Sequence, residues 1–124
     1  MSSLEVPARS RPKRLLLVED EPLIAAGIAQ VLEDNGYVAI HSAYTFVEAT
    51  QAAETGSFDG AILDVMLSTR YVWPIAETLR AKGTPFVLLT GLGRESIEPE
   101  FQDVPVIFKP FGEAELMRVL KSLL

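Results

Sequence analysis

Acidic residues stand at the ends of two short apolar runs in this 124-residue sequence. Glu19 and Asp20 follow the run at 15–18, and Asp64 ends an apolar run within 58–67. Carboxylate oxygens are the ligands that Mg²⁺ prefers in proteins, and a carboxylate can also be the nucleophile that accepts a phosphoryl group. Clustered carboxylates repel one another, so these acids would favour a bound cation if the fold brought them together.

A hydroxyl group and an ammonium group follow two later apolar runs. Thr90 comes after the run at 86–89, and Lys109 comes after the run at 106–108. The lysine could neutralise phosphoryl oxygens and the threonine could donate a hydrogen bond to them, while Gly91 leaves room for a phosphoryl group near the backbone. Each residue alone is more simply explained as a cap or a surface residue. The complete set, spread over the ends of several runs, favours a phosphoacceptor site.

The elements that would position these residues follow from the hydrophobic pattern. Apolar residues recur at helical spacing within 23–32, 46–53, 75–80 and 116–124, and the predicted strands between them are 14–18, 37–40, the run ending at Asp64, 86–89 and 106–108. This alternation predicts a doubly wound α/β fold with a five-stranded parallel sheet, since parallel crossovers need helices. Of the two common strand orders, the flavodoxin-like order 2-1-3-4-5 suits a chain of this length. In that order the carboxyl ends of strands 1, 3, 4 and 5 meet at one edge.

Two segments depart from the alternation. Residues 65–71 have no helical period and are predicted to form a loop. Residues 94–104 are acidic and interrupted by Pro99, so any fourth helix there is predicted to be short or irregular.

Composition limits the classes of function that the chain can serve. A hydrophobic content of 48% supports one domain with a real core at 14–124, behind a flexible basic tail at 1–13. The sequence has no cysteine, which excludes disulfides and thiolate metal sites. The net charge of −6, despite the basic tail, argues against nucleic-acid binding. No run is long enough for a signal peptide or a membrane span, so we expect a cytoplasmic protein that does not bind membranes.

The candidate residues resemble the receiver domain of two-component response regulators, and the similarity covers the whole predicted domain. Glu19 and Asp20 match the acidic pair of that family, and Asp64 matches its phosphoacceptor. Thr90 and Lys109 match the family's hydroxyl residue and lysine. The resemblance implies that Asp64 accepts a phosphoryl group, with no enzymatic activity beyond self-catalysed phosphotransfer and dephosphorylation.

The same resemblance implies a cofactor and partners. Mg²⁺ would bind the three carboxylates, with Asp20 a direct ligand, Glu19 acting largely through water, and the backbone carbonyl of Met66 a further ligand. The peptide bond before Pro110 would be cis. A histidine kinase or histidine phosphotransfer protein would supply the phosphoryl group, and a downstream protein would receive the signal. The resemblance is consistent with a monomer or weak dimer.

A narrower resemblance is to alphaproteobacterial single-domain regulators with a PFxFATGYG signature. The stretch at 85–93 reads PFVLLTGLG. It keeps Pro85, Phe86, Thr90, Gly91 and Gly93, and it carries Leu88, Leu89 and Leu92 where the signature has two aromatic residues and an alanine. This resemblance implies a bacterial regulator that works without an attached output domain.

One departure from the family bears on signalling. Val106 stands where most receivers carry a switch aromatic, three residues before Lys109. We therefore hypothesise that Thr90 and residues 91–104 reorganise on phosphorylation and change the affinity for a protein partner. Two alternatives stay open at this point: a scaffold of the same fold that binds partners without phosphorylation, and a phosphate sink that drains a kinase.

Overall fold

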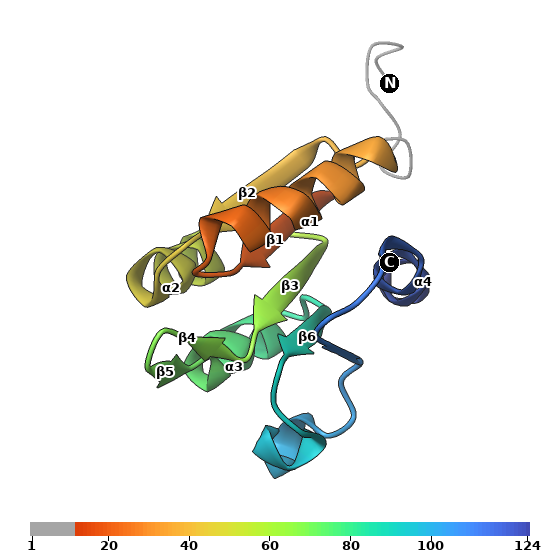
Figure 1. The fold of residues 1–124 in the computed structure, drawn as a ribbon. Coiled ribbons are helices and arrows are strands. Elements are labelled where there is room, and N and C mark those ends of the chain that lie inside the picture. Colours follow the sequence, from red (N-terminus) through yellow and green to blue (C-terminus); the bar gives the residue numbers. More distant parts are fainter. Residues whose placement is uncertain (1–11) are drawn as a thin grey trace.

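The structure is a computed structural model that describes residues 12–124. Its centre is a sheet of five parallel strands: β1 (Arg14–Val18), β2 (Ala39–Ala43), β3 (Gly60–Asp64), β6 (Phe86–Thr90) and β7 (Val106–Phe108). Their order across the sheet is β2-β1-β3-β6-β7, of which Figure 1 labels the first four, and this order confirms the one predicted from the sequence. The basic tail predicted at 1–13 lies, for residues 1–11, outside the described residues.

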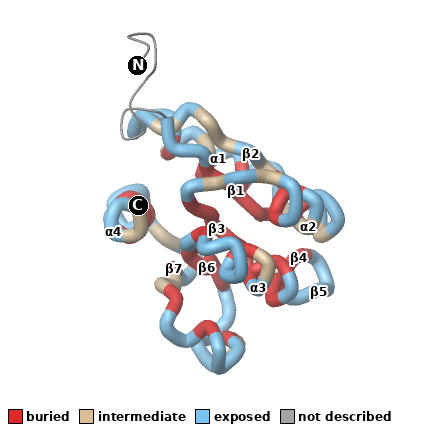
Figure 2. Tube along the Cα trace, turned by 180° about the vertical axis from the view of Figure 1, so that it is seen from behind, coloured by how far each residue is buried: buried red, intermediate tan, exposed pale blue. Residues whose placement is uncertain are grey.

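Helices cover both faces of the sheet. They are α1 (Pro22–Asp34), α2 (Phe46–Thr55), α3 (Trp73–Ala81) and α4 (Glu113–Leu123). The apolar residues of α1 and α4 form one buried cluster with one face of the strands, and those of α2 and α3 form a second cluster with the other face. All residues of β3 and β6 are buried (Figure 2), as expected for central strands of a parallel sheet.

Strand β2 begins later than the sequence predicted. The prediction placed it at 37–40, whereas the strand runs from Ala39 to Ala43. Gly36 has φ +92°, and the Tyr37 amide donates a hydrogen bond to the Leu32 carbonyl at 2.9 Å. Tyr37 therefore belongs to the C-terminal cap of α1, a glycine-dependent arrangement that the apolar pattern alone does not distinguish from a strand start.

Residues 65–71, predicted as a loop, contain a short antiparallel hairpin. Strands β4 (Met66–Leu67) and β5 (Arg70–Tyr71) pair with each other and lie beside α3 (Figure 1). The Val72 amide donates to the Val65 carbonyl at 2.8 Å, which closes the hairpin at its base. Strands of two residues are too short to leave an alternating pattern in the sequence.

The segment after β6 confirms the prediction of a short, irregular fourth helix. It holds two 3₁₀ turns, η2 (Arg94–Ser96) and η3 (Pro99–Phe101), in place of a regular helix. Phe101 is fully buried and stacks on Trp73 with ring centroids 5.4 Å apart. The segment is therefore anchored to α3 by an aromatic contact. No helix within 12–124 is both long enough and apolar enough to cross a membrane.

Candidate functional site

Five of the six predicted site residues lie at the carboxyl ends of four neighbouring strands. Glu19 and Asp20 follow β1, Asp64 ends β3, Thr90 ends β6 and Lys109 follows β7. The backbone hydrogen bonds between strands continue up to the site. The Glu19 amide donates to the Ala43 carbonyl at 3.2 Å, and the Lys109 amide donates to the Thr90 carbonyl at 2.8 Å. The backbone on each side is thus fixed by its neighbours.

The three acids converge on one point. One carboxylate oxygen from each of Glu19, Asp20 and Asp64 lies within 4.8 Å of the other two. Glu19 is 1% exposed and Asp64 is 6% exposed, while Asp20 is only partly buried. Carboxylates are almost never so buried unless they are paired or bind a cation. A nearby positive charge is therefore needed to stabilise the ionised acids.

Lys109 supplies part of that charge. Its Nζ donates to Glu19 Oε2 and to Asp64 Oδ2, each at 3.0 Å. The Lys109 side chain as a whole is 24% exposed, so it is largely shielded from solvent where it meets the two carboxylates. One ammonium group faces three carboxylates, and a negative excess therefore remains.

The pKa of the Glu19 carboxyl group is raised from 4.5 to about 7. Burial is the largest cause, the nearby Asp64 charge acts in the same direction, and Lys109 opposes both. Burial would lower the pKa of Lys109, but its hydrogen bonds with Asp64 and Glu19 outweigh burial and raise the pKa above its usual value. Lys109 is therefore a fixed positive charge, whereas Glu19 gains a proton near neutral pH.

Thr90 and Gly91 border the site from β6. Thr90 is 1% exposed, and its Oγ1 accepts a hydrogen bond from the Leu92 amide at 3.0 Å. A Cβ atom placed on Gly91 would meet no other atom within 4 Å, so the space beside the backbone is open there. The Thr90 hydroxyl thus holds the first turn of the 91–104 segment, and it also has a hydrogen of its own to donate.

Two expectations from the family resemblance concern the backbone. The peptide bond between Lys109 and Pro110 is cis, as predicted. The Met66 amide lies 3.4 Å from Asp64 Oδ1, which places this residue next to the phosphoacceptor candidate. The role of the Met66 carbonyl as a metal ligand stays a prediction.

Sequence reasoning missed a residue that contacts the acids. The Ser68 amide, in the turn between β4 and β5, donates to Asp20 Oδ2 at 2.8 Å. Ser68 has φ +57°, a conformation that glycine or asparagine would normally signal. A serine carries no such signal, so neither the turn nor its contact with Asp20 could be read from the sequence.

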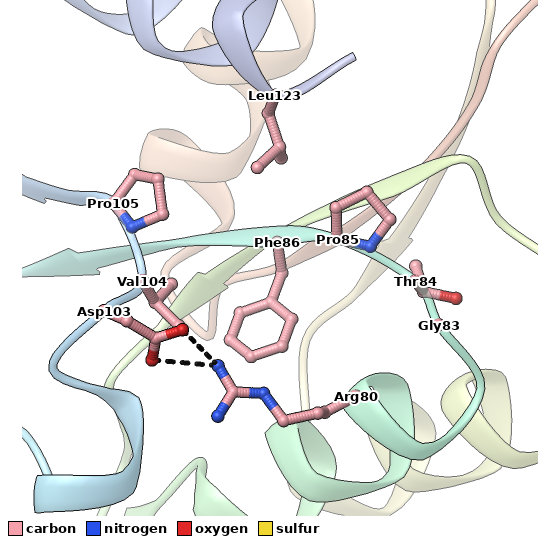
Figure 3. Close-up of a pocket in the computed structure, with 9 residues that line it drawn as sticks. All are labelled: Arg80, Gly83, Thr84, Pro85, Phe86, Asp103, Val104, Pro105 and Leu123. Atoms are coloured by element: carbon pink, nitrogen blue, oxygen red, sulfur yellow. Dashed lines mark hydrogen bonds and ion pairs between the residues drawn. The ribbon is translucent and has the colours of Figure 1, made fainter.

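A hollow lies at the opposite edge of the sheet from these residues, where β6 and β7 begin (Figure 3). Its volume is about 300 Å³, and Pro85, Phe86 and Pro105 contribute to its lining. Arg80 and Asp103 face each other across its rim with 3.2 Å between Nη2 and Oδ1. None of the six predicted site residues lines this hollow.

Comparisons with known proteins agree with the geometry. The family model of the response regulator receiver domain matches residues 15–121. The transcriptional regulatory protein CusR of Escherichia coli (strain K12) is 35% identical over 118 residues, which cover 90% of this chain and 51% of CusR. The chain spans about half the length of the curated relatives it matches.

Solved structures show the same fold. The solution structure of SdrG from Sphingomonas melonis Fr1 has 37% identity and a TM-score of 0.78, with 90% of this chain and 96% of SdrG covered. The receiver domain of sensor histidine kinase PA1611 from Pseudomonas aeruginosa PAO1, solved with magnesium in its active-site cleft, has 22% identity and a TM-score of 0.72, with 91% and 98% covered. The family match over most of the chain decides the assignment: this chain belongs to the receiver domains of two-component response regulators.

Proposed function

We propose that this chain accepts a phosphoryl group on Asp64 from a histidine kinase or a histidine phosphotransfer protein. The observation that carries the proposal is the environment of Asp64, a carboxylate 6% exposed at a strand end, 3.0 Å from the Lys109 ammonium. A solvent-screened surface acid would not need such a partner. The family membership supports the same reaction, since receiver domains are phosphoacceptor signalling domains.

The transfer needs a nucleophile and a means of balancing charge. An oxygen of Asp64 attacks phosphorus, the bond between phosphorus and the donor's imidazole nitrogen breaks, and an acyl phosphate forms while the histidine leaves. Lys109 lies 3.0 Å from Asp64 before the transfer and would offset charge on the phosphoryl oxygens. In this proposal Thr90, at the end of the neighbouring strand, donates its hydroxyl hydrogen to the new group.

The residues at this edge fit Mg²⁺. They offer hard oxygen ligands from Glu19, Asp20 and Asp64 within 4.8 Å of one another, and the excess of three carboxylates over the one Lys109 ammonium supports a bound cation. We propose that these three carboxylates and the Met66 carbonyl hold the ion. When bound, Mg²⁺ would neutralise charge on the incoming phosphoryl group. The magnesium in the cleft of the PA1611 receiver supports this assignment.

The output we propose is protein binding. Thr90 Oγ1 holds the Leu92 amide, so movement of the hydroxyl toward a phosphoryl group would release the start of the 91–104 segment. That segment lacks a regular helix and would change its affinity for a downstream protein as it reorganises. The proposal includes a bacterial single-domain regulator at 14–124 behind a basic tail, a cytoplasmic location, a monomer or weak dimer, and no binding to nucleic acid or membranes. It assigns no enzymatic activity toward a separate substrate.

The test is the intact mass of the chain after incubation with acetyl phosphate and Mg²⁺. We expect one added phosphoryl group, no addition to the variant Asp64→Asn, and no addition when a chelator removes the metal. A phosphorylated histidine kinase should give the same product faster. Absence of the added mass with both donors, while circular dichroism shows a folded chain, would contradict the proposal and favour an unphosphorylated scaffold.

A further inference from the structure

The short hairpin between β3 and α3 touches the acidic site at one atom. Asp20 is only partly buried, and a hollow of about 180 Å³ lies beside it, between the hairpin and the start of α2. Within residues 12–124, the hydrogen bond from the Ser68 amide is the one that its carboxylate accepts. This bond engages Oδ2 and leaves Oδ1 available.

The turn that delivers this amide has an unusual backbone. Ser68 has φ +57°, the left-handed region that residues with a Cβ atom adopt rarely. Its side chain is exposed and makes no hydrogen bond among the described residues. In this left-handed conformation the Ser68 N–H group is directed toward Asp20.

The hairpin is held from its second strand. The guanidinium carbon of Arg70 lies 3.5 Å from the centre of the Phe46 ring, a close cation–π contact. Phe46 is the first residue of α2, and the helix start is itself fixed: the Glu48 amide donates to Thr45 Oγ1 at 3.1 Å, and the Tyr44 amide donates to Glu48 Oε1 at 3.1 Å. Arg70 thus connects the hairpin to a rigid helix start.

We propose that the β4–β5 hairpin is a positioning element for Asp20, in which the Ser68 amide orients the carboxylate and the Arg70–Phe46 contact holds the hairpin in place. The inference rests on the proposed function for the identity of the ion. Within residues 12–124, Arg70 makes no hydrogen bond or ion pair with Asp20, Glu19 or Asp64, so we infer that it acts through the hairpin. Groups that orient a metal ligand typically contribute 10- to 100-fold to metal affinity.

The test is Mg²⁺ binding by isothermal titration calorimetry. We expect Arg70→Ala to raise the Kd for Mg²⁺ by about tenfold, the lower end of the range for such orienting groups. Ser68→Gly retains the amide and accepts the positive φ, so its Kd should match that of the natural chain. Arg118→Ala, an exposed arginine on α4 with the same loss of charge, is the matched control and should leave the Kd unchanged.

Two measurements separate positioning from general damage. Urea unfolding should show that Arg70→Ala still folds cooperatively, and in an Asp20→Ala background the Arg70→Ala change should have no further effect on the Kd. Equal Kd values for Arg70→Ala and the natural chain would overturn the positioning role while leaving the proposed function intact. A tenfold loss in Ser68→Gly would equally overturn it, because the amide is still present. If the natural chain binds no Mg²⁺, this inference and the proposed metal site both fail.

Discussion

The two edges of the sheet both carry ion pairs, and the pairs differ in burial and balance. At the carboxyl edge, Lys109 meets the buried carboxylates of Glu19 and Asp64. At the opposite edge, Arg80 and Asp103 pair one to one with side chains 42% and 75% exposed. A balanced, exposed pair needs no further partner, whereas buried carboxylates that outnumber the cation cost stability unless another charge arrives.

The surroundings of the two cations differ in the same way. Arg80 lies over the Phe101 ring at 4.7 Å and donates to the Glu100 carbonyl at 2.7 Å, so it braces the 3₁₀ turns against α3. Among the described residues, the side-chain hydrogen bonds of Lys109 go only to carboxylates. Arg80 therefore belongs to the scaffold, and under the proposed function Lys109 takes part in the chemistry.

Removal of the lysine charge should have the largest effect. Lys109→Met keeps the length of the side chain but leaves Asp64 without its cation, and we expect the rate of phosphoryl uptake from acetyl phosphate to fall by about 10²-fold, the usual cost of a lost charge-stabilising group. Intact-mass time courses would measure it. A rate within twofold of the natural chain would show that Lys109 is another structural brace.

The next effect should follow pH. Mg²⁺ must displace the proton on Glu19, whose pKa is raised to about 7 by burial. We expect Mg²⁺ affinity to rise with pH by up to about tenfold per unit below pH 7 and to level off above it. Calorimetric titrations across this range would measure the slope, and Glu19→Gln should flatten it. An identical slope in that variant would assign the proton to another group.

The same pKa predicts the pH dependence of stability without metal. The folded chain binds the Glu19 proton more tightly than the unfolded chain, whose pKa is near 4.5. This contribution to the free energy of unfolding is therefore complete below about pH 4.5 and is lost as pH rises through about 7. Urea unfolding in chelator should show Glu19→Gln losing less stability over that interval than the natural chain.

A smaller effect is expected at Thr90. Thr90→Val preserves the shape of the side chain but leaves the Leu92 amide without its acceptor, at a cost of about 1 kcal/mol. Hydrogen exchange at Leu92 should become faster, and the response of residues 91–104 to beryllofluoride should shrink. If exchange across 91–104 is the same with and without beryllofluoride in the natural chain, the proposed output segment is wrong.

The smallest effect should come from the opposite edge. Arg80→Ala removes an exposed ion pair and an aromatic contact, and we expect a loss of about 1 kcal/mol in the free energy of unfolding. Phosphoryl uptake and the Kd for Mg²⁺ should stay unchanged. A large change in phosphoryl uptake or in the Kd for Mg²⁺ would show that Arg80 contributes to the site as well as to the scaffold.

The features that could be predicted from the sequence are the strands and helices, which follow from hydrophobic periodicity, and the polar residues at the strand ends. The strand order followed from alternating elements, and that order sufficed to bring Asp64 and Lys109 to one edge. The start of β2 was misplaced because Gly36 continues the α1 cap through Tyr37. The apolar pattern does not distinguish a residue in such a local helix cap from the first residue of a strand.

The supporting contacts of the site were beyond sequence reasoning for a related reason. The Ser68 amide is a backbone group in a left-handed turn, and the contact between Arg70 and Phe46 joins β5 to the first residue of α2. Neither contact follows from the spacing of apolar residues. Residues that perform chemistry were therefore easier to predict than the residues that orient them.

The most direct test of the central claim is chemical mapping of the phosphorylated residue. Borohydride reduces an acyl phosphate on aspartate to homoserine, and peptide mass spectrometry then identifies the position. After reaction with acetyl phosphate and Mg²⁺, we predict conversion at Asp64, with none at Asp20 and no reduction product at Glu19. Conversion at Asp20 or Glu19, or an acyl phosphate that persists in Asp64→Asn, would contradict the assignment of Asp64 as the phosphoacceptor.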